Sequence, residues 1–270
     1  MDLTTVATIT PARTRDDLAA LGATVAPLAG GSELFADPRI HLTGLVDLQT
    51  MGWPALTITA DGLEIAATCT LAELSRLPAQ PGWVAHPVFH QACTALFGSF
   101  KVWNVATVGG NLCTSLPAGP MICLTAALDA EVLIWRADGT DERMPALGFV
   151  TGNTTNVLDA GDVLRSIHVP AAALAARTAY RKIALLPLGR SGAVLIGRHR
   201  RRLRAHRDRR HRAPGAAALP AGARRDSAGR RHRRDRRLVH GCARRRRLAP
   251  RRERSARRGD PPGAGRAGPP

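Results

Sequence analysis

The chain has 270 residues and a formal net charge of +18, but the charge is concentrated at one end. Residues 1–198 carry 13 Lys and Arg against 16 Asp and Glu, a net charge of −3, whereas residues 199–270 carry 26 Arg against 5 Asp and Glu. This length allows one large domain or two small ones, and the slightly acidic first part gives no reason to expect a specific nucleic-acid partner.

Strands with short helices between them are predicted before residue 70. The strands are β-branched or apolar runs between turn residues, at 4–10, 23–28, 45–48, 55–60 and 63–68. Thr14 is expected to cap a short helix that ends before Gly22, and Asp61-Gly62 predicts a hairpin turn. The strand at 23–28 is expected to be buried, and Ser32 to cap a short helix over 33–36.

The pattern after residue 70 mixes helices and strands without strict alternation. Thr70 and Glu73 match a capping box, which predicts a helix ending before Pro78. Further helices are predicted at 87–97 and 118–129, a helical turn at 171–177, and strands at 131–136, 141–144, 163–169, 179–185 and 193–196. This mixture predicts an α+β fold with lobes at about 1–54 and 55–170, followed by a further unit.

Residues 199–270 differ in composition from the rest of the chain. They contain no Ile, Met, Phe, Trp, Tyr, Lys, Asn, Gln or Thr, so disorder is expected because too little apolar surface is present to form a core. A nucleic-acid-binding arm, a solvated linker and a reading-frame shift in a GC-rich gene are the alternatives. The frameshift explains the composition best, because Arg, Ala, Gly and Pro are the amino acids whose codon families begin with two G/C bases.

Signals for metal sites, catalytic groups and targeting are missing from the sequence. The five cysteines have no C-x-x-C spacing, which argues against zinc and iron–sulfur sites, and no catalytic residue is predicted. The four histidines of the first part have no triad context, and we expect each to be a surface or a structural histidine; they are His41, His86, His90 and His168. Without a signal peptide or a membrane-length apolar run, the expected compartment is the cytoplasm.

Two pairs of adjacent glycines are the best candidates for a ligand site. Gly30-Gly31 stands between a predicted strand and a predicted helix start, and Gly109-Gly110 follows a β-branched run. A tight turn between strands would explain either pair alone. Inward-turned amides of such loops can also form a nest that fits a pyrophosphate. The two loops together, with little side-chain chemistry around them, predict a protein that holds a cofactor.

In five ordered segments the chain resembles the FAD-binding (medium) subunit of molybdenum hydroxylases, such as xanthine dehydrogenase and aerobic carbon monoxide dehydrogenase. LAGGSEL at 28–34 is similar to the first FAD loop of that family, and ATVGGNLC at 106–113 to its second, the most specific part. The other segments are LVDL at 45–48 with LEIAATCT at 63–70, ALDA at 127–130, and GDVLRSIHVP at 161–170. The resemblance covers about residues 5–197.

This resemblance implies a two-lobed, PCMH-like FAD-binding domain over residues 1–170, with residues 171–198 beginning a C-terminal flavoprotein domain that is incomplete. FAD would lie non-covalently between the lobes, with its pyrophosphate on the backbone amides of both loops. Leu164 would lie near the ring system and Lys182 near the polar edge of the flavin, although Lys182 can also be a solvated strand residue. The implied cofactor-binding residues are Leu28, Ala29, Gly30, Gly31, Ser32, Glu33, Thr107, Val108, Gly109, Gly110, Asn111, Leu164 and Lys182.

One position departs from the pattern of the family. Nine residues after Asn111 the family often has an acidic residue, and here that position is Pro120. A contact to the cofactor at this position is therefore in doubt.

The resemblance also implies a role as an electron-transfer subunit. Molybdopterin would belong to a large partner subunit and 2Fe-2S clusters to a small one. Electrons would then pass to this FAD and on to NAD⁺, oxygen or another acceptor. An inactive frameshifted product, nucleic-acid binding through the tail and a self-contained flavin oxidase remain the alternatives.

Overall fold

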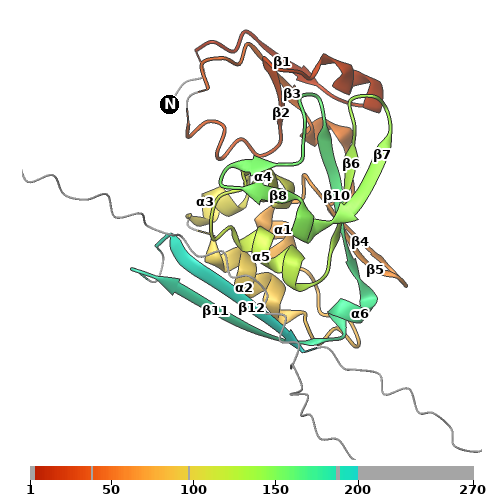
Figure 1. The fold of residues 1–270 in the computed structure, drawn as a ribbon, viewed down its shortest axis with the longest axis vertical. Coiled ribbons are helices and arrows are strands. Elements are labelled where there is room, and N and C mark those ends of the chain that lie inside the picture. Colours follow the sequence, from red (N-terminus) through yellow and green to blue (C-terminus); the bar gives the residue numbers. More distant parts are fainter. Residues whose placement is uncertain (1–3, 38, 97, 187–188, 200–270) are drawn as a thin grey trace, which may run out of the picture.

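A computed structural model describes residues 4–37, 39–96, 98–186 and 189–199 of the protein. These residues form short strands and helices in a mixed arrangement, which confirms the predicted α+β class (Figure 1). The predictions for residues 200–270 lie outside the described residues. Among the described residues, no helix combines the length and apolarity needed to cross a membrane.

The N-terminal part is a small parallel sheet. Its strands are β1 (Thr8–Pro11), β2 (Val25–Leu28) and β3 (Gly44–Asp47), with β3 in the centre. A 3-10 helix (Arg15–Ala20) follows Thr14, whose hydroxyl and amide form the predicted capping interaction with Asp17. β2 is only partly buried, so the prediction of a buried strand is wrong.

The predicted helix over 33–36 does not form. The amides of Phe35 and Ala36 instead donate to the carbonyls of Gly31 and Glu33 in consecutive turns. Pro38 follows too closely for a helix to propagate, because proline lacks an N–H group and disfavours a helical conformation at the residue before it.

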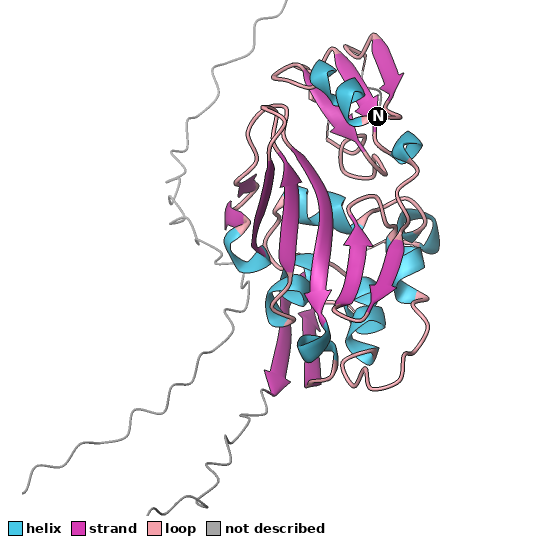
Figure 2. Ribbon diagram, turned by 90° about the vertical axis from the view of Figure 1, so that its right-hand side faces the viewer, coloured by secondary structure: helices cyan, strands magenta, loops and turns pink. Residues whose placement is uncertain are grey.

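A second, antiparallel sheet forms most of the remaining framework. In spatial order its strands are β4 (Leu56–Thr59), β5 (Gly62–Ala66), β10 (Val163–Pro170), β6 (Glu131–Trp135) and β7 (Asp141–Pro145). The Asp61-Gly62 turn joins β4 to β5 as predicted. Figure 2 shows the helices behind one face of this sheet.

The helices are α1 (Leu71–Ser75), α2 (Pro87–Ala95), α3 (Phe100–Trp103), α4 (Val108–Thr114), α5 (Pro120–Ala127) and α6 (Ala171–Leu174). Thr70 caps α1 through the predicted capping box with Glu73. α5 is buried almost all round, because the sheet lies on one side of the helices and a hairpin on the other (Figure 1).

That hairpin consists of β11 (Arg177–Ala184) and β12 (Ser191–His199), which match two strands predicted from the sequence. β12 packs on α5 and β11 on α2, so Val194 and Ile196 belong to the main core. A second pair of short strands, β8 (Val150–Gly152) and β9 (Thr155–Asn156), was not predicted. The lobe boundaries inferred from the sequence stay a prediction.

A cluster of aromatic and cationic side chains joins the N-terminal sheet to the larger one. The register of β10 against β6 shifts between Leu164 and Ser166, so Arg165 lies at an irregularity in the strand. Its guanidinium stacks 4.2 Å from the centre of the Trp53 ring, and the Trp53 and Trp135 rings meet edge to face at 5.5 Å. Both tryptophans also pack against the buried cluster that contains Val46 of β3, and this links the stack to the N-terminal sheet.

Candidate functional site

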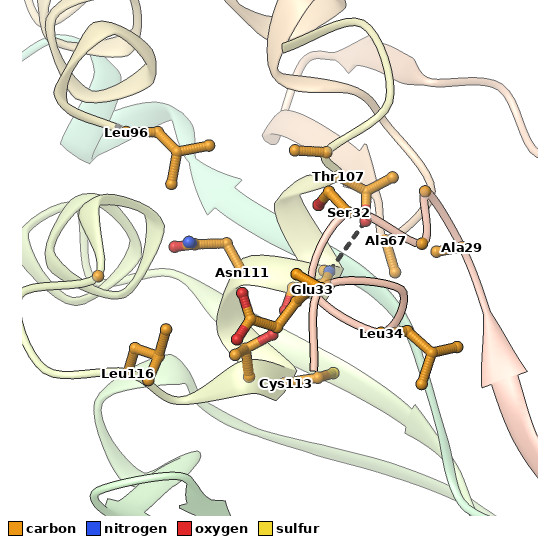
Figure 3. A pocket seen from close by; sticks show the side chains of 18 of the residues that line it. Ala29, Ser32, Glu33, Leu34, Ala67, Leu96, Thr107, Asn111, Cys113 and Leu116 are labelled. Carbon is orange, nitrogen blue, oxygen red and sulfur yellow. Dashed lines mark hydrogen bonds between the residues drawn. The ribbon is translucent and has the colours of Figure 1, made fainter. Parts of the chain in front are cut away.

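A cavity of about 840 Å³ lies where the N-terminal sheet meets the helices (Figure 3). Its volume is within the range of roughly 300–1,000 Å³ that is usual for cofactor sites. Its walls come from the ends of elements that are far apart in the sequence. They include residues 28–34, 95–96, 109–111, 116–120, 162–164 and 190–191.

The segment after β2 offers this cavity a row of free backbone donors. Within the described residues, the amides of residues 30–34 donate to no other atom. Gly31 has a φ of +65°, a conformation that favours glycine, and a Cβ at Gly30 would lie 1.5 Å from the carbonyl oxygen of Val105. The two glycines therefore let the segment turn sharply and press against the start of the α4 region while its amides stay available.

The second glycine pair lies in a helix rather than in a loop. Gly109 and Gly110 form part of the first turn of α4, which Thr107 caps by accepting a hydrogen bond from the Gly110 amide at 3.0 Å. The amides of Val108 and Gly109 donate to the carbonyls of Cys69 and Ala67 at 2.8 and 2.9 Å, and the Asn111 amide donates to the Thr107 carbonyl. Two nests of free amides were expected, but only the first glycine pair provides one. The amides of residues 108–111 already donate to oxygen atoms within the chain.

Gly109 and Gly110 have different roles in this helix. A Cβ at Gly109 would lie 2.5 Å from the Cβ of Ala67, so the helix packs directly on the end of β5. A Cβ at Gly110 would meet only the Thr107 hydroxyl oxygen, at 2.8 Å, and would otherwise fill open cavity. Gly110 thus provides space for a ligand.

Asn111 is held in one orientation and projects into the cavity (Figure 3). Its Oδ1 accepts a hydrogen bond from the Met121 amide at 3.1 Å, near the start of α5. The Nδ2 group has no partner among the described residues and can donate to a ligand. Pro120, at the first position of α5, also lines the cavity and brings no carboxylate there.

Asp162 is a buried carboxylate at the cavity wall, but its charge is already compensated. It accepts hydrogen bonds from the Asp159 and Ala137 amides and from the Arg136 guanidinium, which also pairs with Glu142. Burial alone would raise the pKa of this carboxyl, and the three donors together bring the pKa below its usual value. Asp162 therefore stays ionised and fixes the loop that leads into β10.

Two arginines and one glutamate of the cavity lining have charges that no neighbouring group neutralises within the described residues. Arg39, Arg190 and Glu33 all line the cavity, and none makes an ion pair or a side-chain hydrogen bond within the described residues. Cys113 also lines it, and burial raises the pKa of its thiol to about 12, which keeps the thiol neutral and a poor nucleophile. The cavity therefore combines donors and positive charge with no activated nucleophile.

The structure brings together most of the residues that the resemblance implied. Those that line the cavity are Leu28, Ala29, Gly30, Gly31, Ser32, Glu33, Thr107, Gly109, Gly110, Asn111 and Leu164. Val108 does not, because its side chain is fully buried in the core. Lys182 does not either, because it lies on the half-buried face of β11, opposite Val194 of β12.

Sequence reasoning missed Arg39 and Arg190. Arg39 lies shortly after the first glycine pair, so a search for cations near that loop would have found it. Arg190 had no such signal, because only the packing of the hairpin on α2 brings it to the cavity. The Ser191 hydroxyl anchors this packing by donating to the Ala95 carbonyl at 3.0 Å.

Comparison with protein families gives a match over most of the residues that the structure describes. The family described as the FAD binding domain in molybdopterin dehydrogenase matches residues 4–172. Xanthine dehydrogenase 1 of Arabidopsis thaliana is 30% identical over 124 residues, which are 43% of this chain and 9% of the plant protein. A xanthine dehydrogenase-type FAD-binding subunit of Escherichia coli, XdhB, is 28% identical over 148 residues, 53% of this chain and 49% of that protein.

The fold also occurs in solved structures. Quinoline 2-oxidoreductase from Pseudomonas putida superposes with a TM-score of 0.62 and 20% identity, over 73% of this chain and 69% of that chain. At this identity the likeness shows the fold alone. The chain spans about half or less of the length of the curated relatives given above.

Proposed function

Because the chain belongs to the family of FAD-binding domains of molybdopterin dehydrogenases, we propose that it binds FAD in this cavity and relays electrons within an oxidoreductase complex. The observation that carries the proposal is the row of free amides at residues 30–34, opposite the open face of Gly110. A diphosphate is the group of FAD that suits these donors, since its oxygens accept several hydrogen bonds at once.

The rest of the cavity fits the other parts of FAD. Leu164 is almost fully buried at the start of β10, and Leu96 and Leu116 provide further apolar surface for planar rings. The Asn111 amide and the Ser32 and Thr107 hydroxyls supply polar contacts among these apolar walls. Thr107 can still donate its hydroxyl proton, because the capping bond from Gly110 uses it as an acceptor.

The chemistry of the complex would be divided among its subunits. Bound FAD supplies the capacity to accept electrons singly or in pairs, while this chain binds it, orients it and shields it from water. We assign substrate oxidation to a molybdopterin-binding large subunit and electron delivery to a 2Fe-2S small subunit. The comparisons give no support to the expectation that NAD⁺ is the acceptor.

FAD titration of the purified full chain tests this proposal. Quenching of flavin fluorescence should saturate at one FAD per chain, and Gly110→Val should prevent it by filling the open face of α4. Gly22→Val is a suitable control, because a Cβ at Gly22 would have no atom within 4 Å. A well-folded chain that carries no flavin and does not bind added FAD would refute the proposal.

The relay itself needs a separate test. Iron–sulfur and molybdopterin subunits from the same source, mixed with the FAD-loaded chain, should co-elute with it and bleach its flavin absorbance when substrate is added. Flavin that stays oxidised in a complex whose iron–sulfur clusters are reduced would contradict the electron-transfer role.

A further inference from the structure

Two arginines from different parts of the chain line the cavity. Arg39 belongs to the N-terminal part, in the segment that follows the free amides, and Arg190 lies in the turn of the β11–β12 hairpin, directly before β12. Both are exposed, and neither has a hydrogen-bond or ion-pair partner among the described residues. Each side chain is therefore free to meet an anion that enters the cavity.

Two arginines of the larger sheet, by contrast, have partners. Arg136 pairs with Asp162 and Glu142, and Arg165 stacks on Trp53. Since Asp162 is neutralised in this way, Glu33 is the only unpaired acid among the described lining residues, against two unpaired cations. The unpaired side chains that line the cavity thus carry a net positive charge, which favours an anionic ligand.

We infer that Arg39 and Arg190 recognise the diphosphate of the ligand that fills this cavity and that they determine its preference for a dinucleotide over an uncharged flavin. The inference rests on the proposed function and adds two residues to the site. Guanidinium groups suit this task because their planar donors bind phosphate oxygens in pairs. The amides of residues 30–34 would hold the same group through the backbone.

The test compares ligands that differ in charge. FAD, riboflavin and inorganic pyrophosphate are titrated into the full chain and into Arg39→Gln, Arg190→Gln and the double variant, at low and moderate salt. Arg143→Gln is the matched control, because Arg143 is an exposed arginine of β7 that does not line the cavity and has no ion pair with any residue that the structure describes. Circular dichroism and thermal unfolding establish that each variant folds.

We expect each single variant to bind FAD about tenfold more weakly, as for the loss of one charge-assisted hydrogen bond, and to bind riboflavin like the wild type. The salt dependence of FAD binding should also become shallower in the double variant. FAD affinity unchanged in the double variant, or an equal loss for FAD and riboflavin, would overturn the inference.

The pyrophosphate titration separates this inference from the proposed function. If the wild type binds no FAD but pyrophosphate raises its unfolding temperature, and the double variant loses this effect, the anion site stands and the FAD proposal fails. If FAD binds, but pyrophosphate does not compete with it and pyrophosphate binding does not depend on the two arginines, the FAD proposal stands and the inference fails.

Discussion

At the scale of single residues, the glycines of the cavity differ in what a side chain would meet. A Cβ at Gly30 would lie 1.5 Å from a backbone oxygen of Val105, which cannot move without displacing the chain. A Cβ at Gly110 would meet only the Thr107 hydroxyl, at 2.8 Å. One glycine thus allows two backbones to approach, and the other keeps space for a ligand, so substitutions at the two should separate folding from binding.

Gly30→Ala is therefore expected to lower both stability and FAD affinity, whereas Gly110→Ala should lower mainly FAD affinity. Overpacking of this kind costs about 1–3 kcal/mol of unfolding free energy, and the Gly110 variant should lose less than the Gly30 variant, because a hydroxyl rather than a backbone carbonyl has to shift. Urea denaturation and FAD titration measure the two effects. Equal stability losses in both variants would show that Gly110 faces protein rather than cavity.

The carboxylate of Asp162 gives stability a dependence on pH. Its pKa is lowered in the folded protein, so its stabilising contribution is present above the unfolded pKa of about 3.9 and disappears as the pH falls through the folded value. Asp162→Asn should cost about 1–3 kcal/mol at pH 7, because it weakens the hydrogen bonds from Arg136 and two amides. The gap between wild type and variant should narrow below pH 4.

Urea unfolding at pH 7, 5 and 3 measures this gap. Asp16→Asn is the control, because Asp16 is exposed and its carboxylate accepts no hydrogen bond within the described residues. A gap that stays constant from pH 7 to pH 3 would mean that the ionisation of Asp162 contributes nothing to folding.

At the scale of elements, local chemistry accounts for what could be predicted. The Thr70 capping box, the Asp61-Gly62 turn and the periodic apolar residues of α2 each act within a few residues, and each element formed as expected. The exceptions depend on more distant contacts. The segment 33–36 is held as turns, and Gly109-Gly110 became a helix because Val108 and Gly109 bond to carbonyls near β5.

The stack of Arg165 on Trp53 and Trp135 is a contact between elements whose contribution to the free energy of unfolding can be measured. Arg165→Met keeps most of the apolar stem but removes the charge that lies over Trp53 and, at 5.5 Å, over Trp135. A cation–π contact of this kind contributes about 0.5–2 kcal/mol, so the variant should lose that much unfolding free energy. Arg143→Met serves as the exposed comparison in the same denaturation experiment, and equal values for the two would argue against the stack.

At the scale of the whole molecule, the site depends on how segments distant in sequence pack. The similarity of residues 28–34 and 106–113 to two known loops predicted that both segments belong to one site, and both do line the same cavity. The different roles of the two segments, free amides in the first and open space at Gly110 in the second, were not predictable. They depend on which amides find carbonyl partners in the fold. The place of Arg190 at the cavity and the absence of Lys182 from it likewise follow from the packing of the hairpin on α2 and α5.

Because one cavity is shared by the N-terminal sheet, the helices and the hairpin, FAD should stabilise all three as a unit. At a free FAD concentration 100-fold above Kd, linkage predicts about 2.7 kcal/mol of added stability. For a domain of about 200 residues, roughly the size of the described part, this corresponds to a rise in Tm of about 5–10 °C, in a single transition. Thermal unfolding with and without FAD measures the shift, and hydrogen exchange locates it. Protection should increase together at residues 28–34, 95–96 and 162–164, since all of them line the cavity. Protection confined to residues 28–34 would mean that the ligand rests on the N-terminal sheet alone and does not bridge the walls.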